Sequence, residues 1–327
     1  MHYVYEGYGG YGVLVYVIDT GVHVTHREFG GRARWGTTFF PSEGYFDRDG
    51  HGTHVAGTIA SHTYGVAKSA QIRAVKVFGT TESGSTQTVI KGVEWAVKDA
   101  IAQAQANPET FRGAVINMSL GGGRSQATDD AANNAVRAGA HVIVSSGNDN
   151  KDACNQSPAA AELVITVGAS RIDDVRSQFS NWGPCVDVHA PGTAILSTWT
   201  GSDNAKNVLD GTSMSAPHVS GLVAYFLSIY PHWTFNPHYP KSDGDLALYE
   251  PRLFGKNDPI PLKPKTTGMG PYWMKKALLG LSSRGKLSGL PSGTPNLLVF
   301  NNFTHERIVP ESLLTDSDDQ WAGDASY

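Results

Sequence analysis

The feature that most constrains the fold is a regular alternation of short apolar runs with longer helical stretches. Apolar, β-branched runs occupy Val13–Ile18, Ala114–Met118, His141–Ser145 and Leu163–Val167. Short runs of this kind, closed by turn residues, are typical of strands buried on both faces of a parallel sheet. Strands that alternate with helices predict an α/β fold: a doubly wound, mostly parallel central sheet with helices on both faces, in three α/β/α layers.

The stretches between these runs carry helical signals. Apolar residues in 88–105 recur at helical spacing, and 126–138 is rich in alanine. Residues 272–281 predict a further helix, and 297–300 predict the last strand. In doubly wound sheets the chemistry lies at the carboxyl ends of the strands, so we expect the functional residues there.

Length and charge limit the classes of partner. The 327 residues include 26 Lys and Arg against 30 Asp and Glu, a formal net charge of −4. So small a charge gives no electrostatic reason for binding nucleic acid or an acidic membrane. No apolar run reaches the ~18–20 residues of a membrane span. We therefore expect neither nucleic acid nor membrane as a partner, and we expect a monomer.

The domain organisation follows from changes in composition. We expect residues 1–305 to form one domain. Residues 235–271 hold many prolines, mixed charge and no clear periodicity, which indicates a surface insertion; a disordered loop is the alternative. Residues 306–327 are acidic and polar, and we expect them to form a disordered tail.

Three segments combine chemically active side chains with glycines. They are 16–21 (Tyr-Val-Ile-Asp-Thr-Gly), 49–57 (Asp-Gly-His-Gly-Thr-His-Val-Ala-Gly) and 211–218 (Gly-Thr-Ser-Met-Ser-Ala-Pro-His). A serine hydroxyl needs a base to become a nucleophile, imidazole suits that task, and a carboxylate holds the imidazole in the right tautomer. Asp19 at a strand end, His51 opening a small-residue helix and Ser213 heading an apolar helix supply these groups.

Each of these residues alone has an ordinary structural explanation. An Asp at a strand end forms turns, a Ser before a helix caps it, and an isolated His lies at the surface or in the core. The order Asp19, His51, Ser213 is more specific, because it is the order of subtilisins, whereas α/β-hydrolases have Ser, Asp, His. An esterase of the α/β-hydrolase type therefore fails on chain order.

The segments closely resemble those of the subtilisin-like serine proteases (peptidase S8 family), nearest to the proteinase K branch and, within it, to vacuolar proteases of the cerevisin kind. The similarity covers roughly residues 3–231 and 272–302. It includes Val66-Ala67-Lys68, Val75-Lys76-Val77, Asn117-Met118-Ser119-Leu120-Gly121-Gly122, Ser145-Ser146-Gly147-Asn148 and Phe179-Ser180-Asn181-Trp182-Gly183. The resemblance implies a serine endopeptidase that forms an acyl-enzyme on Ser213, with Asp19 and His51 completing the triad.

The resemblance also implies how the substrate is held. Asn148 would donate to the oxyanion beside the backbone N–H of Ser213. The segments implied to bind an extended polypeptide are Ser83-Gly84-Ser85, Ser119-Leu120-Gly121 and, as the other wall of the P1 pocket, Ser145-Ser146-Gly147. These walls are small and uncharged, so we expect broad specificity with a preference for apolar or aromatic P1 residues.

Two further features follow from the resemblance. Cys154 and Cys185 match cysteines that some members of the branch join in a disulfide, which would indicate an oxidising compartment; two free buried thiols are the alternative. Asp187 aligns with a carboxylate ligand of a calcium site, with the carbonyls of Glu162 and Val164 as its partners. One carboxylate makes a weak site, so calcium would be an optional structural ion, and no cofactor is required.

The remaining histidines of the motifs are expected to be structural. His54 and His218 do not form a zinc site of the metalloprotease type, because such a helix would read His-Glu-x-x-His.

The start of the chain departs from the family pattern. Members carry a signal peptide, a propeptide that inhibits the enzyme and assists its folding, and a mature segment before the first strand, whereas Tyr3 already aligns close to that strand. We expect these segments to be absent from this chain, through truncation or an altered gene. An inactive, peptide-binding or misfolded relic is therefore the alternative to an enzyme. The expected location is secreted or vacuolar and lysosome-like.

Overall fold

The structure, a computed structural model, describes residues 5, 8–80, 84–230 and 269–301. Its helices are α1 His51–Ala60, α2 Thr86–Ala106, α3 Gln126–Arg137, α4 Thr212–Ile229 and α5 Pro271–Leu281, with short 3-10 turns η1 Arg27–Phe29 and η2 Ala153–Asn155. Its strands are β1 Val13–Asp19, β2 Ala33–Thr38, β3 Gln71–Lys76, β4 Gly113–Met118, β5 Gly122–Gly123, β6 His141–Ser145, β7 Gln156–Ser157, β8 Ile165–Ser170, β9 Val188–Pro191, β10 Ile195–Thr198, β11 Lys206–Leu209, β12 Ser283–Arg284 and β13 Leu297–Leu298.

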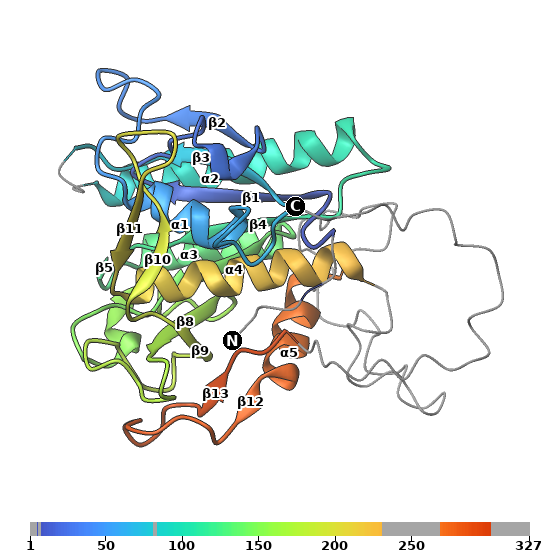
Figure 1. Cartoon of the computed structure of the whole chain (residues 1–327). Coiled ribbons are helices and arrows are strands. Elements are labelled where there is room, and N and C mark those ends of the chain that lie inside the picture. Colours follow the sequence, from blue (N-terminus) through green and yellow to red (C-terminus); the bar gives the residue numbers. More distant parts are fainter. Residues whose placement is uncertain (1–4, 6–7, 81–83, 231–268, 302–327) are drawn as a thin grey trace, which may run out of the picture.

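The central sheet has the strand order β12-β13-β9-β8-β6-β4-β1-β3-β2 (Figure 1). All of its pairings are parallel except β12 with β13. Strand β1 lies between β3 and β4, with Val17 in register with Ala74 on one side and Asn117 on the other. The carboxyl end of β1 is therefore enclosed by the ends of two neighbouring strands, which is where doubly wound sheets bind ligands.

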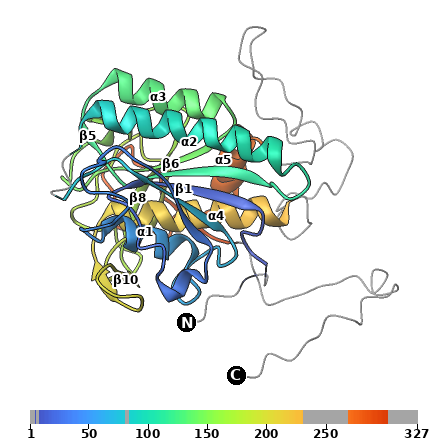
Figure 2. The ribbon, with the colours of Figure 1, turned by 90° about the horizontal axis from the view of Figure 1, so that it is seen from above.

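Two hydrophobic cores cover the two faces of this sheet, and β1 contributes to both. Val13, Val15 and Val17 pack in the core shared with α1 and α4, whereas Leu14, Tyr16 and Ile18 pack in the core shared with α2 and α3. This alternation is the period of two that a strand imposes on its side chains. Figure 2 shows the resulting layers, with α2 and α3 on one side of the sheet and α1 and α4 on the other. The predicted three-layer fold is confirmed.

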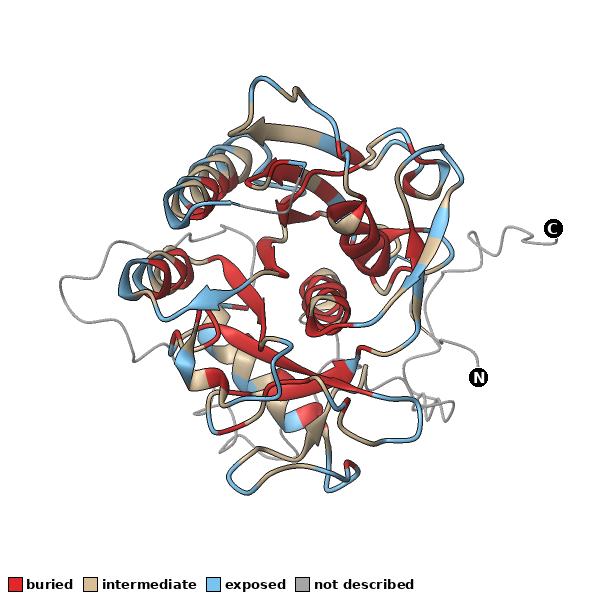
Figure 3. Cartoon of the chain, turned by 90° about the vertical axis from the view of Figure 1, so that its left-hand side faces the viewer, coloured by how far each residue is buried: buried red, intermediate tan, exposed pale blue. Residues whose placement is uncertain are grey.

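Helix α4 is buried on almost every side, as Figure 3 shows, whereas α2 and α3 keep exposed faces. A helix that is apolar all round belongs in a core. Because α4 is held by packing along its whole length, its first turn is a rigid platform for side chains at the sheet edge. In the described part of the chain, no helix combines the length and the apolar character that crossing a bilayer requires.

Most predicted elements lie close to the observed ones. The run predicted at 163–167 is the exception, since β8 begins at Ile165 and continues to Ser170. The antiparallel pairs β10–β11 and β5–β7 had no clear sequence signal. Of the predicted insertion only residues 269–271 are described; the rest of it, and the predicted tail at 306–327, lie outside the described residues.

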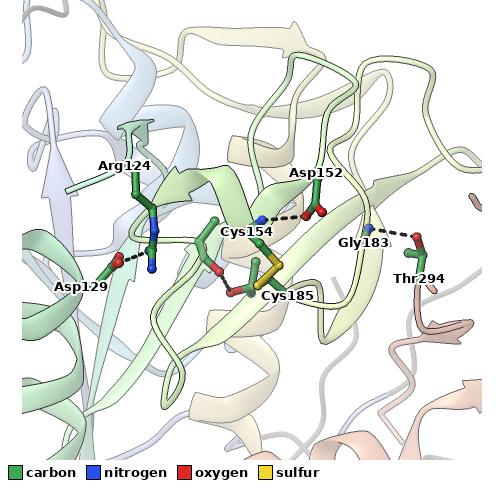
Figure 4. The surroundings of a disulfide bond; sticks show 9 residues. Arg124, Asp129, Asp152, Cys154, Gly183, Cys185 and Thr294 are labelled. Atoms are coloured by element: carbon green, nitrogen blue, oxygen red, sulfur yellow. Dashed lines mark hydrogen bonds and ion pairs between the residues drawn. A yellow bond between two sulfur atoms is a disulfide. The ribbon is translucent and has the colours of Figure 1, made fainter. Parts of the chain in front are cut away.

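The predicted disulfide between Cys154 and Cys185 is present, with a Cα–Cα distance of 5.3 Å (Figure 4). These are the only two cysteines of the chain, so the alternative of free thiols is excluded. Asp152 accepts from the backbone N–H of Cys154 at 2.9 Å, and Gly183 donates to the hydroxyl of Thr294 at 2.9 Å. The bridge therefore fastens the loop that follows β6 to the segment that leads into β9.

Candidate active site

The carboxylate at the end of β1 holds the imidazole at the start of α1. Asp19 is 1% exposed, and its Oδ1 accepts from the Nδ1–H of His51 at 2.8 Å and from the backbone N–H of Thr20 at 2.7 Å. The His51 side chain retains 20% of its exposure, so the ring reaches the surface. A buried carboxylate paired with a partly exposed imidazole fixes the ring so that Nε2 faces outward as the basic nitrogen.

Glycines make this approach of α1 to β1 possible. Gly50 precedes the helix with φ 106°, a backbone conformation that favours glycine. A Cβ at Gly52 would collide with the carbonyl oxygen of Gly21. The sequence 50–52 therefore brings the first turn of α1 directly against the loop that follows Asp19, as the small residues of this helix predict.

Asp47 stabilises the same junction, and the sequence analysis missed it. This buried carboxylate accepts from the backbone N–H of Gly50 at 2.9 Å and of Thr53 at 3.0 Å, and from the hydroxyl of Thr20 at 3.0 Å. The Thr20 hydroxyl in turn accepts from Gly52 N–H at 2.9 Å. Burial raises the pKa of Asp47, against the opposing effect of the Thr53 hydrogen bond. No local pattern distinguishes it from an ordinary loop aspartate.

Ser213 lies in the first turn of α4, at the same edge of the sheet. Its Oγ donates to the carbonyl of Ser119 at 3.3 Å, and the Ser119 hydroxyl donates to the carbonyl of Ser213 at 2.8 Å. Gly211, which precedes the helix, has φ 152°. Helices α1 and α4 pack against each other, and each presents its N-terminus at the carboxyl ends of the strands. The N-terminus of α4 favours negative charge that develops beside it.

Asn148, in the loop after β6, has its amide group oriented by Thr212. The Oδ1 of Asn148 accepts from the backbone N–H and from the hydroxyl of Thr212, both at 2.8 Å. A backbone N–H can only donate, so the amide oxygen must face Thr212 and the NH₂ group must face away from it. Asn148 is exposed, and its Nδ2 is the amide atom nearest to Gly211. The amide can therefore donate to a negative oxygen held beside Ser213.

Asn181 fixes the loop that carries Asn148. Its buried side chain accepts from the backbone N–H of Asp149 at 3.1 Å and of Lys151 at 2.9 Å, and donates to the carbonyl of Ser146 at 2.9 Å. Both Asn181 and Thr212 occur in motifs that the sequence analysis singled out, but the contacts that Asn181 makes with Lys151 and Thr212 makes with Asn148 span 30 and 64 residues and left no local signal.

The segments predicted to bind substrate lie around the end of β1. Ser119-Leu120-Gly121 follows β4, and Gly84-Ser85 lies between β3 and α2, whose first turn Ser85 caps. Ser83 lies outside the described residues. Because β3 and β4 are the two neighbours of β1, the segments flank the strand that ends in Asp19.

The predicted P1 wall contacts the first of these segments. The hydroxyl of Ser145 donates to the carbonyl of Leu120 at 3.3 Å, which joins residues 145–147 to residues 119–121. Ser145 and Ser146 are 4% and 0% exposed, so this wall presents mainly backbone and Gly147. The N–H of Gly147 donates to the Thr212 hydroxyl at 3.2 Å, which ties the wall to α4.

His54 is buried and His218 is partly buried, and both bond to backbone, as expected of structural histidines. The Nε2–H of His54 donates to the carbonyl of Ile195 at 2.9 Å, and the Nδ1–H of His218 donates to that of Met214 at 2.8 Å. Burial lowers the pKa of His54 to about 4 and also lowers the pKa of His218, so both rings are neutral at pH 7.

The predicted calcium ligands converge, but on a lysine. The Nζ of Lys275 in α5 donates to the carbonyls of Val164 at 2.6 Å and Glu162 at 3.4 Å, and to the Oδ1 of Asp187 at 2.9 Å. An ammonium group therefore stands where the resemblance implied a metal ion. The residues present do not fit calcium at this place, because the positively charged ammonium of Lys275 already binds all three oxygens.

Comparison with known proteins identifies the family of the chain. The sequence profile of the Subtilase family matches residues 10–238. The chain is 46% identical over 299 residues to the subtilisin-like serine protease Pen ch 18 of Penicillium rubens, covering 91% of this chain and 55% of that protein. It is 47% identical to cerevisin of Saccharomyces cerevisiae, covering 91% and 43%, and 48% identical to the subtilisin-like serine protease Rho m 2.0101 of Rhodotorula mucilaginosa, covering 91% and 80%.

A solved structure supports the same relationship. The crystal structure of a cold adapted subtilisin-like serine proteinase superposes with a TM-score of 0.72 at 38% identity, covering 90% of each chain. The chain spans about half the length of several of the curated relatives that it matches. The profile match over residues 10–238 and the identities near 46% show that the chain belongs to the subtilase family.

Proposed function

We propose that this chain is a serine endopeptidase that cleaves peptide bonds through an acyl-enzyme on Ser213. The observation that carries the proposal is the 2.8 Å bond from His51 Nδ1 to the buried Asp19, at the sheet edge where α4 begins. That bond leaves Nε2 as the basic nitrogen, and a nearby serine is the group that it would activate.

The residues would act in the following order. His51 Nε2 takes the proton of Ser213 Oγ as this oxygen attacks the scissile carbonyl, and Asp19 stabilises the imidazolium that forms. The negative oxygen of the tetrahedral intermediate accepts from Asn148 Nδ2 and from the backbone N–H of Ser213. The imidazolium then protonates the leaving amine, and water hydrolyses the acyl-enzyme with His51 again as the base.

The substrate would be an extended polypeptide that pairs as an added strand between residues 119–121 and 84–85. The backbone-rich walls at 119–121 and 145–147 carry no charge of their own, and Asp149 is engaged by Gln156. Specificity would therefore be broad, with apolar or aromatic P1 residues preferred. A panel of chromogenic peptides that differ only at P1 tests this: Phe and Leu should exceed Lys and Asp about tenfold in kcat/KM, and equal or higher values for the charged residues would contradict it.

The setting is part of the proposal. The Cys154–Cys185 bridge supports an oxidising compartment, secreted or vacuolar, because disulfides rarely persist in a reducing cytosol. A propeptide that inhibits the site and assists folding is the expected partner, and its physical basis is the slow formation of a sheet built from parallel, non-local pairings. We expect the enzyme to act as a monomer.

Labelling by a fluorophosphonate, together with casein hydrolysis, tests the central claim. The folded protein should label with one equivalent and cleave casein, and Ser213→Ala should lose both properties. Ser202→Ala is the matched control, since Ser202 lies in an exposed loop and its hydroxyl bonds only to Asn204 among the contacts described. Folded protein that neither labels nor cleaves would instead support the peptide-binding relic.

A further inference from the structure

A lysine side chain occupies the position at which three oxygens converge, at the edge of the sheet opposite Ser213. The carbonyls of Glu162 and Val164 lie just before β8, and Asp187 lies just before β9. Parallel strands begin at the edge opposite to their carboxyl ends, so this cluster is remote from Asp19 and His51. Lys275 reaches it from α5, with its Nζ 2.6 Å from Val164 O, 2.9 Å from Asp187 Oδ1 and 3.4 Å from Glu162 O.

The three acceptors match the capacity of the ammonium group. A lysine Nζ has three N–H donors and no acceptor, and here each donor has one oxygen. A calcium ion would need six to eight oxygens at about 2.3–2.6 Å in the same space. Since two positive charges repel at such short range, calcium and the Lys275 ammonium exclude each other.

Both sides of the contact are held in place by other interactions. The second oxygen of Asp187 accepts from the N–H of Thr166 at 2.8 Å, and Asp187 N–H donates to the Thr166 carbonyl at 2.9 Å. Helix α5 buries Met274 and Leu278 in the core that α4 also enters. Lys275 and Asp187 retain only 22% and 19% of their side-chain exposure, so the pair is shielded from solvent.

We propose that Lys275 is a built-in cation that takes the place and the structural task of a calcium ion in this subtilase. The ammonium neutralises Asp187, satisfies the two carbonyls and fastens α5 to the starts of β8 and β9. The stability that a bound metal would supply at this point therefore comes from the chain itself and does not depend on the calcium concentration. The proposal concerns stability alone and is independent of the proposed protease activity.

Thermal unfolding with and without calcium tests the proposal. All proteins carry Ser213→Ala, to exclude self-digestion, and each is melted in EDTA and in 5 mM CaCl₂. Lys275→Met keeps the length of the stem but removes the charge; Lys276→Met is the matched control, because Lys276 is the exposed neighbour on the same helix and stacks on Tyr272 and Trp273. Lys275→Gln provides a second variant should the Met form fold poorly.

We expect Lys275→Met to melt about 3–6 °C lower in EDTA and to regain at least half of that loss in calcium. The parent and Lys276→Met should respond to calcium equally and less than Lys275→Met. Adding Asp187→Asn to Lys275→Met should abolish the extra response, which places the new ion at this site. The proposal is overturned if removing the Lys275 charge leaves the response to calcium the same as that of the parent, or if the extra response survives Asp187→Asn.

Discussion

The orientation of Asn148 by Thr212 gives the sharpest prediction about catalysis. Thr212→Val removes the hydroxyl that donates to Asn148 Oδ1 at 2.8 Å and keeps both the side-chain shape and the backbone N–H that donates to the same oxygen. One of the two bonds that hold the amide is lost, whereas the amide itself remains. The variant therefore tests orientation separately from the presence of the donor.

The expected magnitudes follow from the bonds involved. Asn148→Ala removes the proposed oxyanion donor, and loss of one such donor costs about 10²–10³ in kcat. Loss of one neutral hydrogen bond costs about 1 kcal/mol, so Thr212→Val should lower kcat about fivefold with KM nearly unchanged. Thr212→Ser keeps the hydroxyl and is the matched control, with an expected loss below twofold.

Initial rates with a chromogenic peptide across the four proteins of a double-mutant cycle are the assay. If Thr212 acts through Asn148, Thr212→Val should have little effect once Asn148→Ala is present, and the two changes should be coupled by about 1 kcal/mol. A fivefold loss that persists in the Asn148→Ala background would refute the reasoning. Such additivity would mean that the Thr212 hydroxyl acts through another group, such as the N–H of Gly147, from which it accepts a hydrogen bond at 3.2 Å.

Three further predictions concern the triad, the disulfide and acid stability. Asp19→Asn should lower kcat about 10³–10⁴-fold, because a neutral amide cannot stabilise the imidazolium and its NH₂ group can donate to Nδ1 and favour the wrong tautomer of His51. Casein or peptide hydrolysis at pH 8, by protein of unchanged circular dichroism, measures this loss, and near-normal activity would contradict the assigned role. Replacing Cys154 and Cys185 by Ser opens a loop of 31 residues, which should lower the free energy of unfolding by about 3.7 kcal/mol. In the Ser213→Ala background the calorimetric midpoint should fall by about 6 °C, and a change below 1 °C would count against a stabilising bridge. Because the folded pKa of His54 lies at about 4, below its ordinary value of 6.5, the unfolded chain binds a proton between these values that the folded chain does not. The free energy of unfolding is therefore unaffected by His54 above pH 6.5. It decreases as the pH falls from 6.5 toward 4, by up to about 1.4 kcal/mol per pH unit. The free energy of unfolding, measured with urea at pH 7, 6 and 5, should therefore fall less steeply with falling pH in His54→Gln than in the parent protein. An unchanged slope would refute this role of His54.

Local pattern was enough to predict the layers and to single out Asp19, His51 and Ser213 as candidate reacting groups. The β-branched run that ends in Asp19 and the apolar periodicity that follows Ser213 predicted β1 and α4. Such patterns are visible in sequence because each element must present apolar side chains at its own period to be buried. The small residues of the helix that His51 opens are likewise consistent with the close approach of Gly52 to Gly21.

The supporting contacts had no such signal. Asp47 resembles any loop aspartate, and nothing local relates Asn148 to Thr212, 64 residues away. Lys275 resembles an ordinary helical lysine, and nothing local in the sequence relates it to Asp187, with which it forms an ion pair at 2.9 Å. Only the packing of α5 against the core determines which of its side chains reaches the starts of β8 and β9.

The sequence by itself therefore determined the layered α/β architecture and the three candidate residues Asp19, His51 and Ser213, because residue periodicity and short motifs can be recognised without knowing the tertiary structure. The tertiary structure alone decided which residue engages the amide oxygen of Asn148, what stabilises the turn after Asp19 and which side chain pairs with Asp187. These depend on the relative placement of elements that are distant in the chain, which is fixed by how whole helices and strands pack together.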